Sequence, residues 1–329
     1  MKSKFQINKY ISWGFMFFRE AWLEFLSQLK AKNINKISLG IGVFDGVHCG
    51  HVKLLNALAE YAHRHNSCPT ALTFSPHPRT LTSPDHPPKL LLPLEKRIEL
   101  LKKSGADEVF VIRFDQEFAH LIAEEFLDIL CLQNEIEISS ITVGRNWRFG
   151  HYGRGNADML ASFCAQNNIF FQPIEELKTG GEVISSSNIR LAITNGMFEK
   201  ASGMLGRKFV LSGKVVKGFS FAGDKLGHPT ANLIPDSEIL PPDGVYGAKV
   251  TVDNSVYLAA VNIGVAPSFA FNQYQRRVEV HLLDFDGNLY DHTIEVDLLK
   301  YIRNERFFES ADALKSQIML DIQQIKSLK

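Results

Sequence analysis

The chain is poor in cysteine, carries no excess of either charge and lacks a long uninterrupted apolar run. Its 329 residues include four cysteines whose spacing fits neither a metal site nor a disulfide framework. Lys plus Arg and Asp plus Glu both number 36, and this net charge of +0 argues against bulk attraction to nucleic acid. These absences argue against a structural zinc site, a disulfide-stabilised domain and a nucleic-acid partner, and we expect reduced thiols in a cytoplasmic protein.

Residues 1–35 are rich in aromatic and aliphatic side chains, and Lys2 and Lys4 precede them, as in a signal peptide. However, Arg19 and Glu20 interrupt the apolar residues and no small-residue cleavage site follows. The stretch is also shorter than the roughly 20 residues that span a bilayer. We therefore expect a helical N-terminal extension that packs on the body of the protein rather than on a membrane.

The remainder of the chain predicts two domains with different architectures. Strand and helix patterns alternate over 36–195, which favours a doubly wound parallel sheet. Beyond a connection at 196–206, short alternating strands predict a second domain over 207–329 that contains a small antiparallel barrel, closed by a helix at 310–328. The expected sheet strands are 37–41, 69–74, 108–114, 138–143 and 169–174, with helices from 52, over 95–103 and over 119–132. The expected barrel strands are 209–216, 244–252, 256–263, 277–285 and 290–298.

A glycine-rich turn joins the first strand to the first helix and reads Gly42-Val43-Phe44-Asp45-Gly46-Val47-His48-Cys49-Gly50-His51. Its glycines permit a sharp turn and close approach of a ligand, and the helix that follows presents unpaired N–H groups. Two histidines three residues apart add donors that can neutralise charge as a phosphoanhydride breaks. We predict a phosphate site with His48 and His51 as catalytic residues and with Gly42, Phe44, Asp45, Gly46 and Gly50 as nucleotide-binding residues.

Glycine-rich turns of this kind are common in α/β proteins without a nucleotide, but the pair His48-x-Gly50-His51 is much rarer. It resembles the signature of the nucleotidyltransferase superfamily. The whole string from Gly42 to His51 is similar to the FAD synthetase module of bacterial bifunctional riboflavin kinase/FAD synthetases. The resemblance implies a nucleotidyltransferase-like sheet domain that adenylylates FMN.

Two further segments follow predicted strands of the sheet. Thr73-Phe74-Ser75-Pro76-His77-Pro78-Arg79 is either a rigid surface turn or a ligand loop, and the family has a similar segment here. Val143 to Gly155 mixes aromatic residues with glycines and arginines, which suits a flat heteroaromatic ring or, alternatively, nucleic acid. The resemblance implies a flavin site formed by His77, Pro78, Arg79, Asn146, Trp147 and Phe149.

The last segment of the first domain reads Ile184-Ser185-Ser186-Ser187-Asn188-Ile189-Arg190. Its serines are good helix N-caps, which is one interpretation. The other is a second phosphate site, in which Ser186 and Ser187 bind the triphosphate and Arg190 acts in catalysis. The family has Ile-Ser-Ser-Thr-x-Ile-Arg at this point.

In the second domain, Gly227-His228-Pro229-Thr230-Ala231-Asn232 resembles the Gly-Phe-Pro-Thr-Ala-Asn motif of riboflavin kinases. The resemblance implies that Thr230 and Asn232 hold Mg²⁺, whose preferred ligands are hard oxygens. The preceding loop would bind nucleotide through Gly218 and Lys225. Glu279 would act as catalytic base, although by itself it is an ordinary strand carboxylate. Arg303 is either a phosphate or flavin contact or a surface helix charge.

Departures from the family bear on the kinase half. His228 replaces a phenylalanine, and Ala266 replaces an arginine near the site. The main prediction is a bifunctional enzyme that phosphorylates riboflavin to FMN and adenylylates FMN to FAD, with Mg²⁺ as cofactor. The alternative is an FAD synthetase with a degenerate flavin-binding C-terminal module.

The expected partners are the small molecules ATP, riboflavin and FMN, and the sequence leaves homo-oligomer formation open. A transferase with a different acceptor would have no reason to carry Pro229-Thr230-Ala231-Asn232. An aminoacyl-tRNA synthetase would need an RNA-binding domain and a Lys-rich second motif, neither of which we find.

Overall fold

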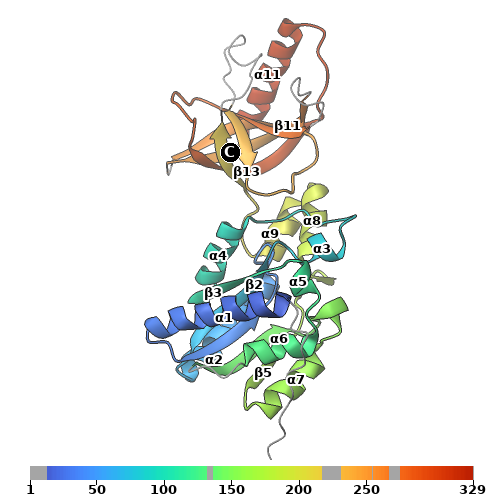
Figure 1. Cartoon of the computed structure of the whole chain (residues 1–329). Helices are drawn as coiled ribbons and strands as arrows, with labels where there is room; N and C mark the ends of the chain where they lie inside the picture. The colour runs from blue at the N-terminus through green and yellow to red at the C-terminus, as the bar shows by residue number, and fades with distance from the viewer. Residues whose placement is uncertain (1–12, 132–135, 217–230, 254, 267–274, 329) are drawn as a thin grey trace, which may run out of the picture. The chain divides into compact units, whose positions relative to one another are not determined.

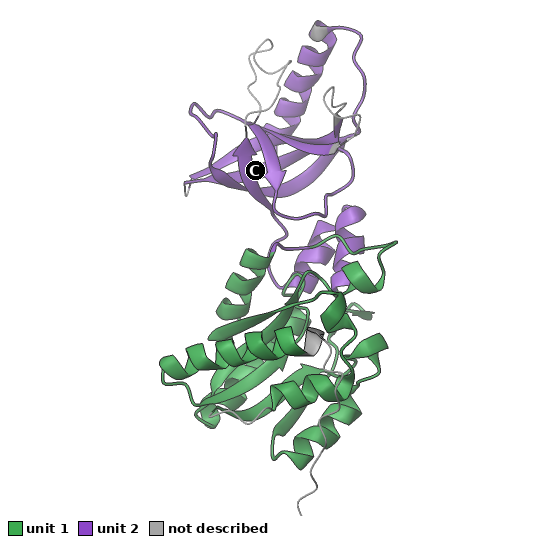
Figure 2. Cartoon of the chain, viewed as in Figure 1, with its two compact units in different colours: residues 1–90, 94–185 green, residues 91–93, 186–329 purple. Residues whose placement is uncertain are grey.

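A computed structural model of the chain describes residues 13–131, 136–216, 231–253, 255–266 and 275–328. The chain divides into two compact units, residues 1–90 with 94–185 and residues 91–93 with 186–329 (Figure 2). The first unit contains a parallel sheet with helices, and the second contains an antiparallel barrel (Figure 1). The second unit includes α8 (Ser186–Thr194) and α9 (Phe198–Leu205), so it begins earlier than the predicted connection at 196–206.

The sheet has the strand order β3-β2-β1-β4-β5 and every neighbouring pair is parallel. Its strands are β1 (Lys36–Ile41), β2 (Cys68–Ser75), β3 (Glu108–Arg113), β4 (Glu137–Gly144) and β5 (Phe170–Ile174). The predicted doubly wound sheet is confirmed. Because β1 leads outward to β2 and β4 lies on its other side, the strand order reverses at the carboxyl ends of β1 and β4, where sheets of this type bind ligands.

Helices enclose the sheet and connect its strands. They are α1 (Trp13–Ala31), α2 (Cys49–Arg64), α3 (Arg79–Thr82), α4 (Leu94–Lys103), α5 (Gln116–Ala119), α6 (Ala123–Leu130) and α7 (Ala157–Gln166). Trp22 and Leu29 of α1 are fully buried and belong to the same apolar core as β1 and α6. The N-terminal helix is therefore part of the core of this unit.

Two predicted helices differ in the structure. The helix expected over 119–132 covers only α6, and the short α5 precedes it, because Asp115 accepts a hydrogen bond from the Phe118 N–H and the Ile122 N–H donates to Glu125. Each short helix thus has its own N-terminal cap. The helix expected to begin at Val52 begins at Cys49, since apolar spacing marks only the buried face and the first turn is set by its cap.

The second unit forms a closed six-stranded barrel in the order β10-β11-β12-β9-β8-β13, which confirms the predicted antiparallel barrel. Its strands are β8 (Leu211–Val216), β9 (Ala231–Pro235), β10 (Gly244–Val252), β11 (Ser255–Ala266), β12 (Gln275–Leu282) and β13 (Thr293–Arg303). The final helix is α11 (Ala311–Lys326). Strand β9 was not predicted, and β13 extends five residues past the predicted end at Leu298.

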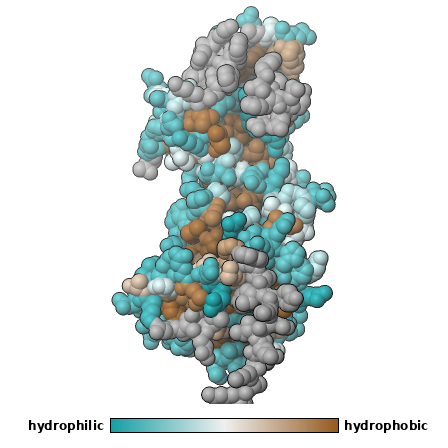
Figure 3. Space-filling view, viewed as in Figure 1, coloured by the Kyte–Doolittle hydropathy of each residue, from teal (hydrophilic) through white to brown (hydrophobic). Residues whose placement is uncertain are grey.

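In the described part of the chain, every helix is too short or too polar to cross a membrane. On the face drawn in Figure 3, apolar side chains gather in separate patches between hydrophilic ones.

Candidate active sites

The turn after β1 has a strained backbone. Phe44 has φ 56° and Val47 has φ 38°, values that residues with a Cβ rarely adopt, while Gly46 has φ 82°. Phe44 and Val47 are buried, at 0% and 1% exposure, so packing holds them in these conformations. Strained conformations cost free energy and persist only where the surrounding structure enforces them. They are concentrated at active sites and ligand sites.

His48 and His51 lie together at the start of α2. Their rings stack with centroids 3.6 Å apart, and the His51 backbone N–H donates to His48 Nδ1 at 3.3 Å. The His48 side chain is therefore the N-cap of α2, with Nδ1 as the acceptor. A side chain on Gly50 would press against the His48 ring, with its Cβ 3.1 Å from Cε1. Glycine at this position leaves room for the imidazole that caps the helix.

His51 is held as a neutral ring. Burial lowers the pKa of His51 well below its usual value, and electrostatic interactions with His48 and Arg97 lower the pKa further. Its Nδ1 is buried and makes no hydrogen bond to the residues that the structure describes. A buried polar atom without a partner is costly, and a bound ligand is one way to satisfy it.

The other predicted residues of this unit follow the two strands that flank β1. His77, Pro78 and Arg79 come directly after β2, and His77 Nδ1 accepts the Arg79 N–H at 3.1 Å. Asn146 and Trp147 come directly after β4, and Asn146 donates to Glu176 Oε1 at 2.9 Å. The sheet thus brings the three predicted segments to one edge.

Trp147 and Phe149 form a stacked pair with ring centroids 4.7 Å apart. Phe149 is buried at 7% exposure and contacts Phe126 of α6, whereas Trp147 is only half-buried. Phe149 therefore supports the Trp147 ring from the core side, which leaves Trp147 as the accessible aromatic surface.

Arg190, Ser186 and Ser187 lie on α8, in the second compact unit. Ser186 and Ser187 form the first turn of this helix and Arg190 follows one turn later. Their contact with ATP remains a prediction.

A polar row crosses the outer surface of the barrel. Glu279 on β12 pairs with Asn232 on β9 and with Asn262 on β11. The residues on either side of Glu279, Val278 and Val280, are buried at 1% exposure, so the polar row lies on the opposite face from the barrel core. The alternation around Glu279 in the sequence predicts that its side chain points to the face opposite Val278 and Val280. However, Glu279 is half-buried rather than an exposed strand carboxylate.

Burial raises the pKa of Glu279, and the carboxylate of Glu305 raises it further, while Arg277 and a hydrogen bond from Asn262 act in the opposite direction. Glu305 itself accepts from Asn262 Nδ2 at 2.9 Å. A carboxylate with a raised pKa is a better proton acceptor than an ordinary glutamate, as a general base requires. Asn262 and Glu305 received no role in the sequence analysis, although a lone asparagine within the apolar run 256–263 was a usable signal.

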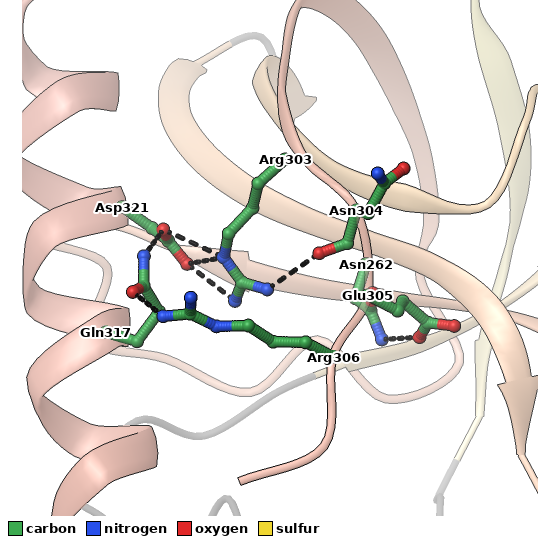
Figure 4. Close-up of polar contacts among 7 residues, drawn as sticks. All are labelled: Asn262, Arg303, Asn304, Glu305, Arg306, Gln317 and Asp321. Carbon is green, nitrogen blue, oxygen red and sulfur yellow. Dashed lines mark hydrogen bonds and ion pairs between the residues drawn. The ribbon is translucent and has the colours of Figure 1, made fainter.

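Arg303 lies at the end of strand β13, so its interpretation as a surface helix charge is wrong. Its Nη2 and Nε form an ion pair with Asp321 of α11, at 2.8 Å and 3.0 Å from Oδ2 (Figure 4). Gln317 also donates to Asp321, and Arg306 donates to Gln317. In this structure Arg303 thus joins the last strand to the final helix.

Several predicted positions of the kinase half lie outside the described residues. These are Gly218, Lys225, His228 and Thr230, together with the side chain of Ala266. The described residues contain no cluster of three or more His, Cys, Asp or Glu that could hold a metal ion. Asn262 Oδ1 is nevertheless buried without a hydrogen-bond partner among them, in the same row as Glu279 and Asn232. This set of amide and carboxylate oxygens fits Mg²⁺.

Comparison with known proteins agrees with both halves of the chain. Residues 30–188 match the family model for FAD synthetase, and residues 205–329 match the model for riboflavin kinase. A bifunctional riboflavin kinase/FMN adenylyltransferase from Buchnera aphidicola (subsp. Schizaphis graminum) is 36% identical over 303 residues, which cover 92% of this chain and 96% of the relative. The chain belongs to the family of bifunctional riboflavin kinases/FMN adenylyltransferases. The predicted pairing of the two activities in one enzyme is confirmed.

Other members of this family are similar over most of their length. The Bacillus subtilis protein is 33% identical, with 88% of this chain and 91% of the relative covered. The protein from Escherichia coli K12 is 36% identical, with 86% and 90% covered. A crystal structure described as a macrolide-efflux protein from Streptococcus pneumoniae has a TM-score of 0.77 and 27% identity, covering 90% of this chain and 95% of that one.

Proposed function

We propose that the two reactions take place at two separate sites, one at the edge of the sheet and one on the barrel. The functional division is an FMN adenylyltransferase domain over 36–195 and a riboflavin kinase domain over 207–329, joined at 196–206 and preceded by the extension 1–35. The observation that carries this proposal is the juxtaposition of His48 and His51 at the start of α2, where the strand order of the sheet reverses.

At the sheet site, the phosphate of FMN attacks the α-phosphate of ATP and releases pyrophosphate. FMN phosphate is already an anion, so this step needs no strong base and depends on positioning and charge stabilisation. His48, His51, Arg190 and the N–H groups of α2 stabilise the phosphates, with Ser186 and Ser187. Trp147 supports the flavin ring, and the loop of His77 and Arg79 borders it.

At the barrel site, Glu279 takes the proton from the ribityl hydroxyl of riboflavin as that oxygen attacks the γ-phosphate of ATP. The half-buried position of Glu279 and its raised pKa support this role. Asn232, together with Thr230, would hold Mg²⁺. The ion supplies positive charge that neutralises the phosphate oxygens.

The cellular setting is proposed from the same evidence. All four cysteines, Cys49, Cys68, Cys131 and Cys164, are free. Free thiols and the balanced charge support a cytoplasmic enzyme that acts on small molecules and not on nucleic acid.

The test is to follow FMN and FAD formation by chromatography with Mg²⁺, ATP and either riboflavin or FMN. His51→Ala should lower FAD formation from FMN by about 100-fold or more while FMN formation persists. Glu279→Ala should lower FMN formation by about 100-fold or more while FAD still forms from supplied FMN. His63→Ala on the exposed face of α2 and Glu295→Ala on the exposed face of β13 are matched controls.

Equal loss of both activities in either variant would contradict two independent sites. If the wild-type protein binds riboflavin without turnover, yet makes FAD from FMN, the second domain is a degenerate flavin-binding module.

A further inference from the structure

Arg97 is a buried arginine that none of the proposed steps uses. It lies in the first turns of α4, where the sequence predicts only a helix, and its side chain is 4% exposed. Its neighbour Lys96 is exposed, as expected for a basic residue on a surface helix. A guanidinium is rarely buried to this extent unless it is paired, so its partners indicate its role.

The guanidinium of Arg97 joins two strands of the sheet at their carboxyl ends. Its Nη1 donates to the carbonyl of Val43 at 3.0 Å, and its Nη2 donates to the carbonyl of Phe74 at 2.9 Å. Val43 lies in the turn after β1, and Phe74 lies at the end of β2. The Val43 carbonyl also accepts from Thr73 Oγ1 at 2.9 Å. The planar fork of arginine thus bridges two backbone segments, which a single ammonium could not do in the same way.

Each of these carbonyls precedes a loop of the proposed adenylyl-transfer site. Val43 belongs to the strained turn that ends at His48 and His51, and Phe74 comes three residues before His77. The backbone hydrogen bond from the Gly42 N–H to the Leu72 carbonyl connects the ends of β1 and β2, and both of its residues come before Val43 and Phe74. Arg97 extends the connection beyond the end of the strands.

Arg97 also contributes its charge to the site. Burial lowers the pKa of Arg97, and the carboxylate of Asp45 in the turn, itself 1% exposed, partly opposes this by favouring the charged guanidinium. Burial has the largest lowering effect on the pKa of His51, and electrostatic interactions with His48 and with the charged Arg97 lower it further. These are the two titratable groups that act on His51 from its own turn and from α4.

We propose that Arg97 is a positioning residue for adenylyl transfer, which fixes the phosphate-binding turn and the His77 loop relative to each other by bridging the Val43 and Phe74 carbonyls. It need not touch either substrate. The proposal rests on the proposed site at His48 and His51. It assigns to α4 a part in bringing FMN and ATP together.

The test compares Arg97→Lys and Arg97→Gln with the control Lys96→Gln, which removes a positive charge from the exposed face of the same helix. FAD formation from FMN is measured as kcat and as KM for each substrate, and riboflavin phosphorylation by the same preparation reports on the barrel. Both Arg97 variants should lower kcat for FAD formation by about 100-fold, since small misplacements of reacting groups have effects of that size. Riboflavin phosphorylation should stay within about two-fold in all three variants, and Lys96→Gln should behave as the wild type.

A second readout separates positioning from simple loss of stability. Arg97→Gln removes the charge that acts on His51, so the acid limb of the pH profile of FAD formation should move to higher pH. Arg97→Lys keeps the charge and should leave that limb in place, although kcat falls. A structural role alone would lower the amount of folded protein without this difference between the two variants.

The outcomes are distinct. If the wild type forms FAD and His51→Ala does not, but folded Arg97→Gln keeps kcat within about two-fold, the proposal for Arg97 fails and the site stands. If Arg97→Lys also fails to fold, Arg97 is a residue of the fold and the proposal fails. If the wild type makes no FAD from FMN, the proposed function itself fails.

Discussion

The ion pair between the barrel and its final helix allows a test of what stabilises the second compact unit. Asp321 of α11 is 5% exposed, and its two oxygens accept hydrogen bonds from Arg303 Nε and Nη2 and from Gln317 Nε2, at distances from 2.7 to 3.1 Å. The perturbation is Asp321→Leu, which keeps a side chain of similar size but removes every acceptor. The guanidinium of Arg303 on the barrel then loses its ion pair with α11.

The expected cost follows from the burial of the pair. Removing one partner of a fully buried ion pair costs about 3–5 kcal/mol of folding free energy. The Arg303 side chain is 19% exposed, so water can partly replace the lost carboxylate. We therefore expect a loss of about 2–3 kcal/mol and a fall of roughly 10 °C in the melting temperature of this unit.

The measurement is thermal unfolding, followed together with both enzyme activities. FMN formation should be lost at a lower temperature than in the wild type. Gln323→Leu places the same residue on the exposed face of α11 and is the control. In a double-mutant cycle with Arg303→Leu, the coupling free energy should be about 2 kcal/mol.

The reasoning would be refuted if Asp321→Leu changed the free energy of unfolding by less than about 0.5 kcal/mol. It would also be refuted if the effects of the two single variants simply added, because the ion pair would then contribute nothing.

Two further predictions concern the sheet unit. Trp22→Ala should lower the free energy of unfolding of the sheet unit by about 3–5 kcal/mol, because the Trp22 ring on α1 is fully buried and contacts Phe110 of β3. Calorimetry measures the lost stability, and FAD formation should be lost at a lower temperature while FMN formation is retained. His51→Gln should change how stability depends on pH. The folded pKa of His51 is depressed, so below pH about 6.5 the unfolded chain binds a proton that the folded chain does not, and wild-type stability falls there by up to about 1.4 kcal/mol per pH unit. The variant should lack this loss, and parallel stability curves of the two proteins between pH 5 and pH 7 would contradict a buried neutral His51.

Local spacing in the sequence predicted the parts of this protein that depend on short-range chemistry. Alternating strand and helix patterns predicted the parallel sheet, and alternating polar and apolar residues predicted the barrel and the direction of Glu279. The turn from Gly42 to His51 was identifiable because its glycines and histidines lie within ten residues, and strand β1 necessarily delivers them to the edge of the sheet.

Tertiary structure alone decided which distant residues support these groups. Arg97 contacts Val43 across 54 positions, and Glu305 contacts Asn262 across 43. The sequence predicted Arg303 as a substrate contact or a helix charge, and its pairing with Asp321 is visible only in the fold. No periodicity records such pairings, because they depend on how helices and strands fold back on one another. The sequence therefore determined the local elements and the candidate groups that they carry, whereas the folded chain determined what holds those groups in position and sets their charge.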